Sequence, residues 1–173
     1  RYSDAQLSLF FDMIFTGDNC PFYQEMSERT GYIYSYGEQF ERYRNIGSLQ
    51  VSYQVSPGKL LASFKKAVDI FEVLKKKPGD LSYVRSIYLD NGELQLDDAA
   101  ELNWNRAYDC HILEEPYGDI EARKEAFRQV TEEQMRQMAR EIFRTGNMTV
   151  IVRGRKKQIP KKKLAAQMER LGP

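Results

Sequence analysis

The chain has 173 residues, of which 42% are hydrophobic and 29% charged, a composition typical of globular proteins and not of disordered or fibrous ones. Its 26 basic and 25 acidic side chains leave a formal net charge of +1, so there is no overall electrostatic bias toward nucleic acid or membrane. The length fits one domain with a sizeable core. No apolar run approaches the roughly 20 residues of a membrane span, and we expect no membrane partner.

The two cysteines lie far apart in the sequence, at Cys20 and Cys110, without the spacing of a metal or redox motif. They do not make a disulfide framework, which favours a reducing compartment. We therefore expect a cytoplasmic location.

The first third of the chain predicts two helices and a strand. Ser3 and the residues that follow it read as a capping box, which predicts a helix ending near Gly17. Pro21 suits the first turn of a second, short helix. After Gly31, tyrosines alternate with smaller residues, and this period of two predicts a strand over residues 32–36.

The next segment has the clearest alternation in the sequence. Residues 48–55 place apolar and polar side chains on opposite faces, which predicts a half-buried strand after a turn at Asn45 and Gly47. A helix is then predicted from Ser56 and Pro57, with Ser as the cap, to the stop at residues 78–79.

The remainder is mostly helical in pattern. Residues 81–128 are predicted to be helical with breaks at residues 91–92 and 116–118, and a capping box at Thr131 opens a helix that closes near Gly146. Residues 148–152 alternate and predict a third strand. Because strands and helices segregate, we predict an α+β fold with a small antiparallel or mixed sheet covered by helices. The predicted domain covers residues 1–154, and residues 155–173 form a basic C-terminal tail.

Catalytic chemistry has little support in the residues. His111 is the only histidine, and Glu115 stands where the inverted zinc motif H-x-x-E-H has its second histidine. A catalytic zinc needs about three protein ligands, so we expect neither a metal ligand nor a catalytic residue in this chain. Cys110 adjoins His111, but neighbours on a helix do not face each other.

The tail carries seven basic side chains and no acidic one between residues 153 and 163. One interpretation is an arm that binds the phosphates of nucleic acid. The other is a solvated end balanced by acidic helices elsewhere. The neutral overall charge and the absence of a stacking motif favour the solvated end, and nucleic acid remains a third alternative.

Aromatic side chains recur at Tyr32, Tyr34, Tyr36, Phe40 and Tyr43. Packing on a sheet face explains most of such a row. A peptide-binding surface is the alternative, because a phenol offers both contact area and a hydrogen bond.

Three segments carry a family likeness. Residues 22–35 (FYQEMSERTGYIYS), which follow a helix and a Gly-containing loop, resemble the corresponding segment of the insulinase-like (pitrilysin) zinc metallopeptidases. Residues 130–133 (VTEE) resemble a helix start, and residues 143–154 (FRTGNMTVIVRG) resemble the closing strand. The likeness runs from about Leu7 to Gly154. The order and spacing of the three segments are more specific to the family than any one segment alone.

The resemblance implies a non-catalytic C-terminal half-domain of a clamshell peptidase, which binds peptide while zinc lies in another half-domain. The family places an Arg and a Tyr seven residues apart to contact substrate. Tyr34 falls on the Tyr position and is our candidate substrate-binding residue, whereas Ser27 stands where the Arg is expected and cannot replace a fixed positive charge.

The resemblance also implies a first strand that this chain lacks. A free sheet edge would follow, open to the other half-domains of the parent protein, to a partner subunit or to a second copy. The alternative function is a catalytically inactive scaffold or interaction module of the same fold.

Overall fold

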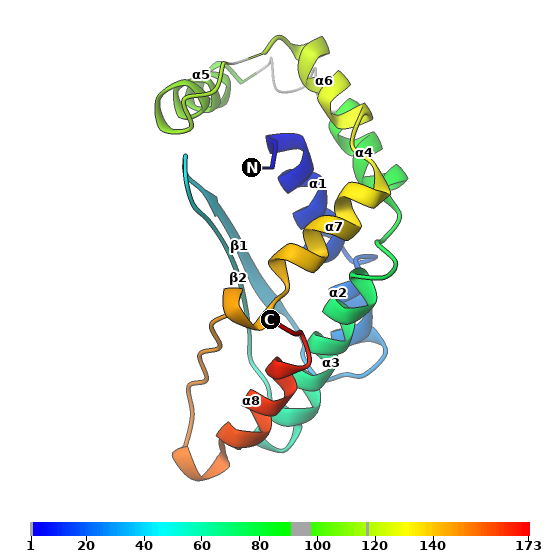
Figure 1. Cartoon of the computed structure of the whole chain (residues 1–173), viewed down its shortest axis with the longest axis vertical. Helices are drawn as coiled ribbons and strands as arrows, with labels where there is room; N and C mark the ends of the chain where they lie inside the picture. The colour runs from blue at the N-terminus through cyan, green and yellow to red at the C-terminus, as the bar shows by residue number, and fades with distance from the viewer. Residues whose placement is uncertain (1, 91–97, 117) are drawn as a thin grey trace.

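The computed structural model describes residues 2–90, 98–116 and 118–173. A hairpin of two antiparallel strands runs along one side of an elongated molecule, and helices line the other side (Figure 1). The predicted α+β class, with a small antiparallel sheet covered by helices, is confirmed.

The helices and strands follow one another along the chain in this order. They are α1 (Asp4–Phe15), α2 (Pro21–Tyr23), β1 (Tyr36–Arg42), β2 (Gly47–Tyr53), α3 (Leu60–Leu74), α4 (Leu81–Asp90), α5 (Ala99–Ala107), α6 (Ile120–Arg128), α7 (Glu132–Ile142) and α8 (Lys161–Glu169). Two π-helical turns extend α2 and α5, over Gln24–Glu28 and Tyr108–Ile112.

Both predicted capping boxes are confirmed. The Ser3 hydroxyl accepts from the amide of Gln6, whose side chain accepts in return from the Ser3 amide. Thr131 and Gln134 make the same reciprocal pair at the start of α7. Each box satisfies amides that the first turn of a helix leaves without partners, which fixes where α1 and α7 begin.

The predicted strand over residues 32–36 is wrong, because β1 begins only at Tyr36. The amides of Tyr32 and Ile33 both donate to the carbonyl of Met26, at 3.0 and 3.2 Å. Gly31, at φ +58°, turns the chain back toward that carbonyl. These amides therefore close the π-helical turn and are not available to a sheet.

The strand predicted over residues 48–55 is confirmed in its alternation and is shorter than expected, since β2 is Gly47–Tyr53. Leu49, Val51 and Tyr53 are half-buried, and the residues between them are exposed. The following helix begins as a single 3-10 turn, Pro57–Lys59, and the Ser56 side chain makes no cap hydrogen bond.

The predicted third strand over residues 148–152 is wrong for the described part of the chain, where these residues are extended but pair with no strand. Met148 and Val152 pack against the core, whereas Ile151 is 88% exposed. Alternation can predict an extended backbone, but a strand also needs a neighbour that supplies hydrogen bonds.

The predicted helical pattern of residues 81–128 is confirmed by α4, α5 and α6. The expected break at residues 91–92 and the residue Tyr117 lie outside the described residues. The tail is more than a solvated end, because it forms α8, which packs against α3 (Figure 1). Leu164 and Leu171 of this segment are buried in the same core as α1 and α3.

The core is rich in aromatic contacts that join distant parts of the chain. The rings of Phe71 and Phe143 stack with centroids 4.1 Å apart, and Phe10 lies 5.7 Å from Phe143. Phe22 packs edge-on against Tyr36, with ring centroids 5.0 Å apart, which fixes the start of the hairpin against α2. The helices thus cover one face of the hairpin, and among the described residues neither of its edges pairs with a further strand.

Candidate functional site

The backbone register of the hairpin shows which peptide groups face outward. The Tyr43 amide donates to the Ile46 carbonyl at 2.8 Å, so these two residues are a hydrogen-bonded pair across the turn. Hydrogen-bonded and non-hydrogen-bonded pairs alternate along an antiparallel ladder. The next residues inward, Arg42 and Gly47, are therefore a non-bonded pair, as are Phe40 with Leu49 and Glu38 with Val51.

The outer edge of β2 is consequently a row of free peptide groups. The amides and carbonyls of Leu49 and Val51 point away from β1, and within the described residues β2 pairs with no other strand. From Gly47 to Tyr53, β2 carries no charged side chain. Proteins usually protect an edge strand with charges, proline or a covering segment. β2 has none of these charges or prolines, and its outward peptide groups can therefore pair with an added strand.

The edge of β1 differs in both respects. β1 carries the charged side chains of Glu38, Glu41 and Arg42. Its outward carbonyl at Arg42 accepts a hydrogen bond from the Tyr108 hydroxyl, so that end of the edge is already occupied. Of the two edges, that of β2 is therefore the better prepared for strand addition.

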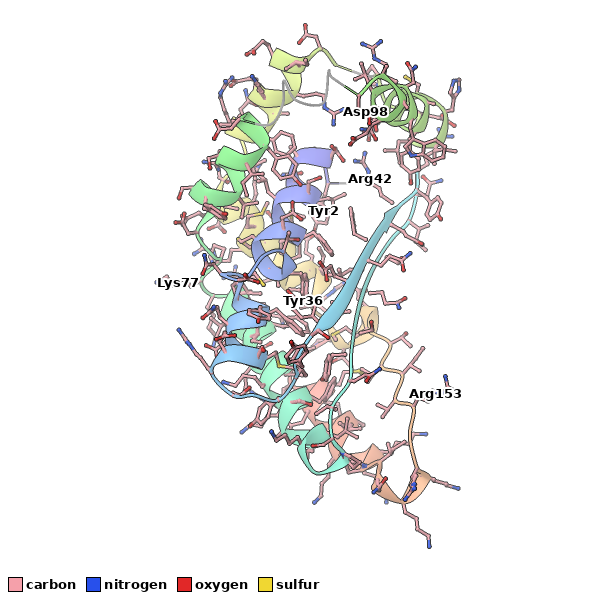
Figure 2. All side chains as sticks on the ribbon, turned by 180° about the vertical axis from the view of Figure 1, so that it is seen from behind. Tyr2, Tyr36, Arg42, Lys77, Asp98 and Arg153 are labelled. Atoms are coloured by element: carbon pink, nitrogen blue, oxygen red, sulfur yellow. The ribbon has the colours of Figure 1, made fainter. Side chains whose placement is uncertain are left out.

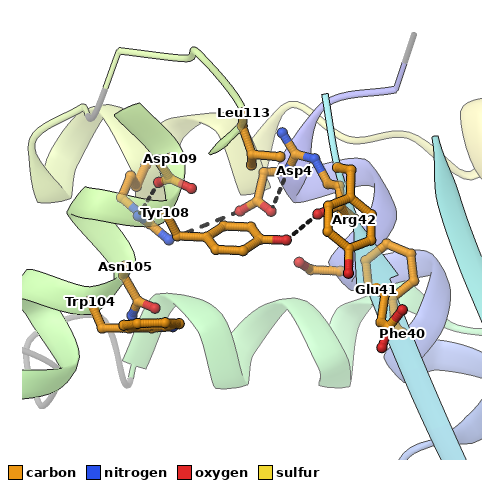
Figure 3. A pocket seen from close by; sticks show the side chains of 12 residues that line it. Asp4, Phe40, Glu41, Arg42, Trp104, Asn105, Tyr108, Asp109 and Leu113 are labelled. Atoms are coloured by element: carbon orange, nitrogen blue, oxygen red, sulfur yellow. Dashed lines mark hydrogen bonds and ion pairs between the residues drawn. The ribbon is translucent and has the colours of Figure 1, made fainter. Parts of the chain in front are cut away.

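A second candidate feature is an open pocket of about 380 Å³ at the tip of the hairpin (Figure 3). The end of β1 forms one wall, and α1, α5 and the π-helical turn after α5 form the others. Trp104, which is 69% exposed, and Tyr108 supply aromatic surface. Asp4, Arg42 and Asp109 supply charge.

Arg42 is the most buried charge in this region, with 8% of its surface exposed. Its guanidinium donates to Asp4 at 2.7 Å and to Glu115 at 2.5 Å. These ion pairs join β1 to α1 and to the loop after the π-helical turn. Because both guanidinium arms are engaged, Arg42 holds the walls of the pocket together and is not free to bind a ligand.

Asp109 lies on the wall opposite Arg42. Burial raises the pKa of its carboxyl above the usual value, and the nearby Arg123, 3.4 Å away, partly offsets this effect. The cations of the pocket are thus matched with its carboxylates.

Tyr34, the predicted substrate-binding residue, lies in the loop before β1 and is 93% exposed. The loop itself is anchored. Ile33 is buried beside it, and the Lys59 ammonium donates to the Gly31 carbonyl at 2.9 Å. An exposed ring on an anchored loop can contact a ligand without rearrangement of the core. The expected Arg position, Ser27, lies in the π-helical turn Gln24–Glu28 and is half-buried.

The remaining aromatic residues of the row behave mostly as sheet packing predicts. Tyr36 and Phe40 are half-buried, and Phe40 stacks on Phe11 at 5.7 Å. Burial raises the pKa of Tyr36 far above its usual value, so its hydroxyl stays protonated and donates to the Phe15 carbonyl. Tyr43, by contrast, is exposed at the turn.

Tyr34→Phe is expected to leave the free energy of unfolding unchanged within about 0.5 kcal/mol, because its hydroxyl contacts solvent. Tyr36→Phe is the matched control. It removes the hydrogen bond to Phe15 and is expected to cost about 1 kcal/mol. Urea denaturation of the two variants measures both values. Equal destabilisation would show that Tyr34 is part of the folded core and not a surface contact.

The sequence candidates for metal and thiol chemistry are dispersed. His111 is exposed in the π-helical turn Tyr108–Ile112, next to the exposed Cys110, while Cys20 is buried near Tyr36. In the described ranges, no group of three or more His, Cys, Asp or Glu side chains is arranged to hold a metal ion. Among those residues no helix is long and apolar enough to cross a membrane.

Sequence reasoning missed Arg42, Trp104 and Tyr108. Arg42 shares a strand face with Phe40, and a charge at an inward position of a strand is a signal for a buried ion pair. Its partners come from Asp4 and Glu115, far away in the chain, and no spacing rule connects them. Trp104 gave no signal, since single exposed aromatics are common.

Two comparisons with known proteins found no match to this chain. No family model matches it, and a search of curated proteins finds no matching relative.

Proposed function

We propose that this chain is a non-catalytic peptide-binding module that holds an extended segment against the outer edge of β2. The observation that carries the proposal is the uncharged edge strand Gly47–Tyr53, whose outward peptide groups have no partner among the described residues. Strand addition at such an edge supplies affinity through main-chain hydrogen bonds.

The side chains of β2 specify the kind of peptide. Leu49, Val51 and Tyr53 lie on the half-buried face, and Ser48, Gln50 and Ser52 lie on the exposed face. Side chains of neighbouring strands lie beside one another on each face. A peptide with alternating apolar and polar residues therefore matches β2, with its apolar side chains continuing the row toward the core.

This binding mode agrees with the resemblance to the insulinase-like zinc metallopeptidases. We propose that the chain serves as the substrate-binding half-domain of such an enzyme, in which zinc and the catalytic residues lie outside this chain. Tyr34, on its anchored loop, is the proposed aromatic contact to the peptide. Ser27 supplies no positive charge, so the proposed role is to hold substrate and not to stabilise the reaction.

Two proline variants test the edge. Val51→Pro removes an outward amide that the hairpin does not use, and is expected to abolish binding of a fluorescein-labelled peptide of alternating valine and lysine. Glu38→Pro is the matched control, because Glu38 is the cross-strand partner of Val51 and its amide faces the opposite edge. Fluorescence anisotropy measures the binding, and circular dichroism confirms that both variants fold.

Loss of binding in Glu38→Pro with full binding in Val51→Pro would overturn the choice of edge. Equal binding by both variants and the wild type would overturn strand addition altogether. A peptide of the same composition with its valines contiguous serves as the sequence control, and is expected to bind more weakly because its apolar side chains cannot all lie on one face.

The alternative is an inactive scaffold or interaction module, which Ser27 in place of an Arg favours. The same edge could then hold a strand from a partner subunit or a second copy of this chain. The gene of the full-length protein discriminates between the two. A segment H-x-x-E-H elsewhere in it favours the peptidase, and its absence favours the scaffold.

A further inference from the structure

The described tail concentrates positive charge at one end of a nearly neutral molecule. Seven side chains carry this charge, and we call them together the basic surface: Arg153, Arg155, Lys156, Lys157, Lys161, Lys162 and Lys163. All seven residues are exposed, and none of their side chains has a hydrogen-bond or ion-pair partner among the described residues. Arg153 lies toward the opposite end of the molecule from Arg42 and Asp98 (Figure 2). The basic surface is thus remote from the pocket.

Most of the basic surface lies on helical turns, where part of its positive charge is electrostatically unfavourable. Lys156 and Lys157 lie in a 3-10 turn, and Lys161–Lys163 form the first turn of α8. Cations at a helix N-terminus oppose the helix dipole, and the cap residue Pro160 offers no side chain to offset them. Unfavourable local placements of this kind, with no compensating contact, are expected at functional positions.

Apolar side chains border the basic surface on the preceding extended segment. Ile151 is 88% exposed and Val150 is 39% exposed, two and three residues before Arg153. From residue 144 to residue 173 the sequence has no aromatic side chain on which a nucleic acid base could stack. Lysines, which act as compact point charges, outnumber arginines in the surface by five to two.

The sequence led us to expect no membrane partner, because no apolar run could span a membrane and the total charge is near neutral. The local concentration of charge changes this expectation: we propose that the basic surface binds the headgroups of an anionic phospholipid membrane, with Ile151 entering the interface. Clustered lysines are attracted to such a surface through their charge, and an adjacent apolar side chain adds burial. The buried Leu164 and Leu171 already place the apolar side of α8 in the protein core, so α8 presents charge and does not insert.

The test is cosedimentation of the whole chain with vesicles of phosphatidylcholine, with and without phosphatidylserine. Binding is expected only with phosphatidylserine and is expected to fall as salt rises. The triple variant Lys161→Glu, Lys162→Glu and Lys163→Glu is expected to bind at least about tenfold more weakly. Its melting temperature is expected to stay the same or rise, because acidic residues suit the start of a helix.

Ile151→Gln separates a membrane from nucleic acid. It is expected to weaken vesicle binding severalfold while the fold is kept, because its side chain is exposed. If Ile151→Gln binds vesicles as tightly as the wild type, and the protein binds duplex DNA equally strongly, the membrane proposal is wrong and the surface binds phosphate groups in general. Absence of vesicle binding in low salt would overturn the proposal outright. Val51→Pro is expected to bind vesicles normally, so failure of the peptide proposal leaves this one testable.

Discussion

Phe143→Ala is expected to destabilise the protein by about 3–5 kcal/mol, the largest loss we predict for a single substitution. Phe143 is buried, stacks on Phe71 of α3 with centroids 4.1 Å apart and packs against Phe10 of α1. Truncation leaves a cavity where α1, α3 and the end of α7 meet. A shift of the urea midpoint at constant slope measures the loss.

Two controls bracket the effect of Phe143. Phe143→Leu keeps much of the volume and is expected to cost clearly less than the alanine variant. Val73→Ala, on the exposed side of α3, is expected to change the free energy of unfolding by no more than about 0.5 kcal/mol. If Phe143→Ala and Val73→Ala had similar midpoints, the segment after α7 would not be part of the cooperative core.

The second large effect concerns the buried ion pairs at the hairpin tip. Replacing both partners of Arg42, with Asp4→Asn and Glu115→Gln, leaves its buried guanidinium without its two ion pairs and is expected to cost about 3–5 kcal/mol. Arg42→Met is expected to cost less, about 1–2 kcal/mol, because the two carboxylates are partly exposed and water can solvate them.

The triple variant is the decisive comparison. Adding Arg42→Met to the double variant removes the uncompensated charge, so the triple variant is expected to be more stable than the double variant. The helix-dipole contribution of Asp4 is lost equally in both and cancels. A triple variant less stable than the double would mean that packing by the arginine side chain outweighs its charge.

Several elements of this protein could be predicted because their causes are local. The capping boxes at Ser3 and Thr131 join residues three apart, so the sequence alone places the starts of α1 and α7. The alternation of β2 is equally local, since side chains one apart along a strand point to opposite faces. The exposed character of Tyr34 agrees with the choice of that residue as a surface contact, and its role as a substrate contact stays a prediction.

The errors have a common origin in backbone hydrogen bonds, which the alternation of side chains does not reveal. The strand predicted at Tyr32 does not form because the Tyr32 amide donates to the Met26 carbonyl. The strand predicted over residues 148–152 does not form because no described strand lies beside it. Both segments have a suitable side-chain pattern. Backbone hydrogen-bond partners decide whether such a pattern becomes a strand.

By itself, therefore, the sequence determined the fold class, the helices with strong caps, the alternating faces of β2 and the cluster of basic charge in the tail. Only the tertiary structure decided that Arg42 is buried between Asp4 and Glu115, that the tail helix packs on α3 and that, among the described residues, β2 pairs with no strand other than β1. The physical reason is that caps and alternation depend on neighbours along the chain, whereas burial, ion pairing and a free edge depend on what the fold brings alongside.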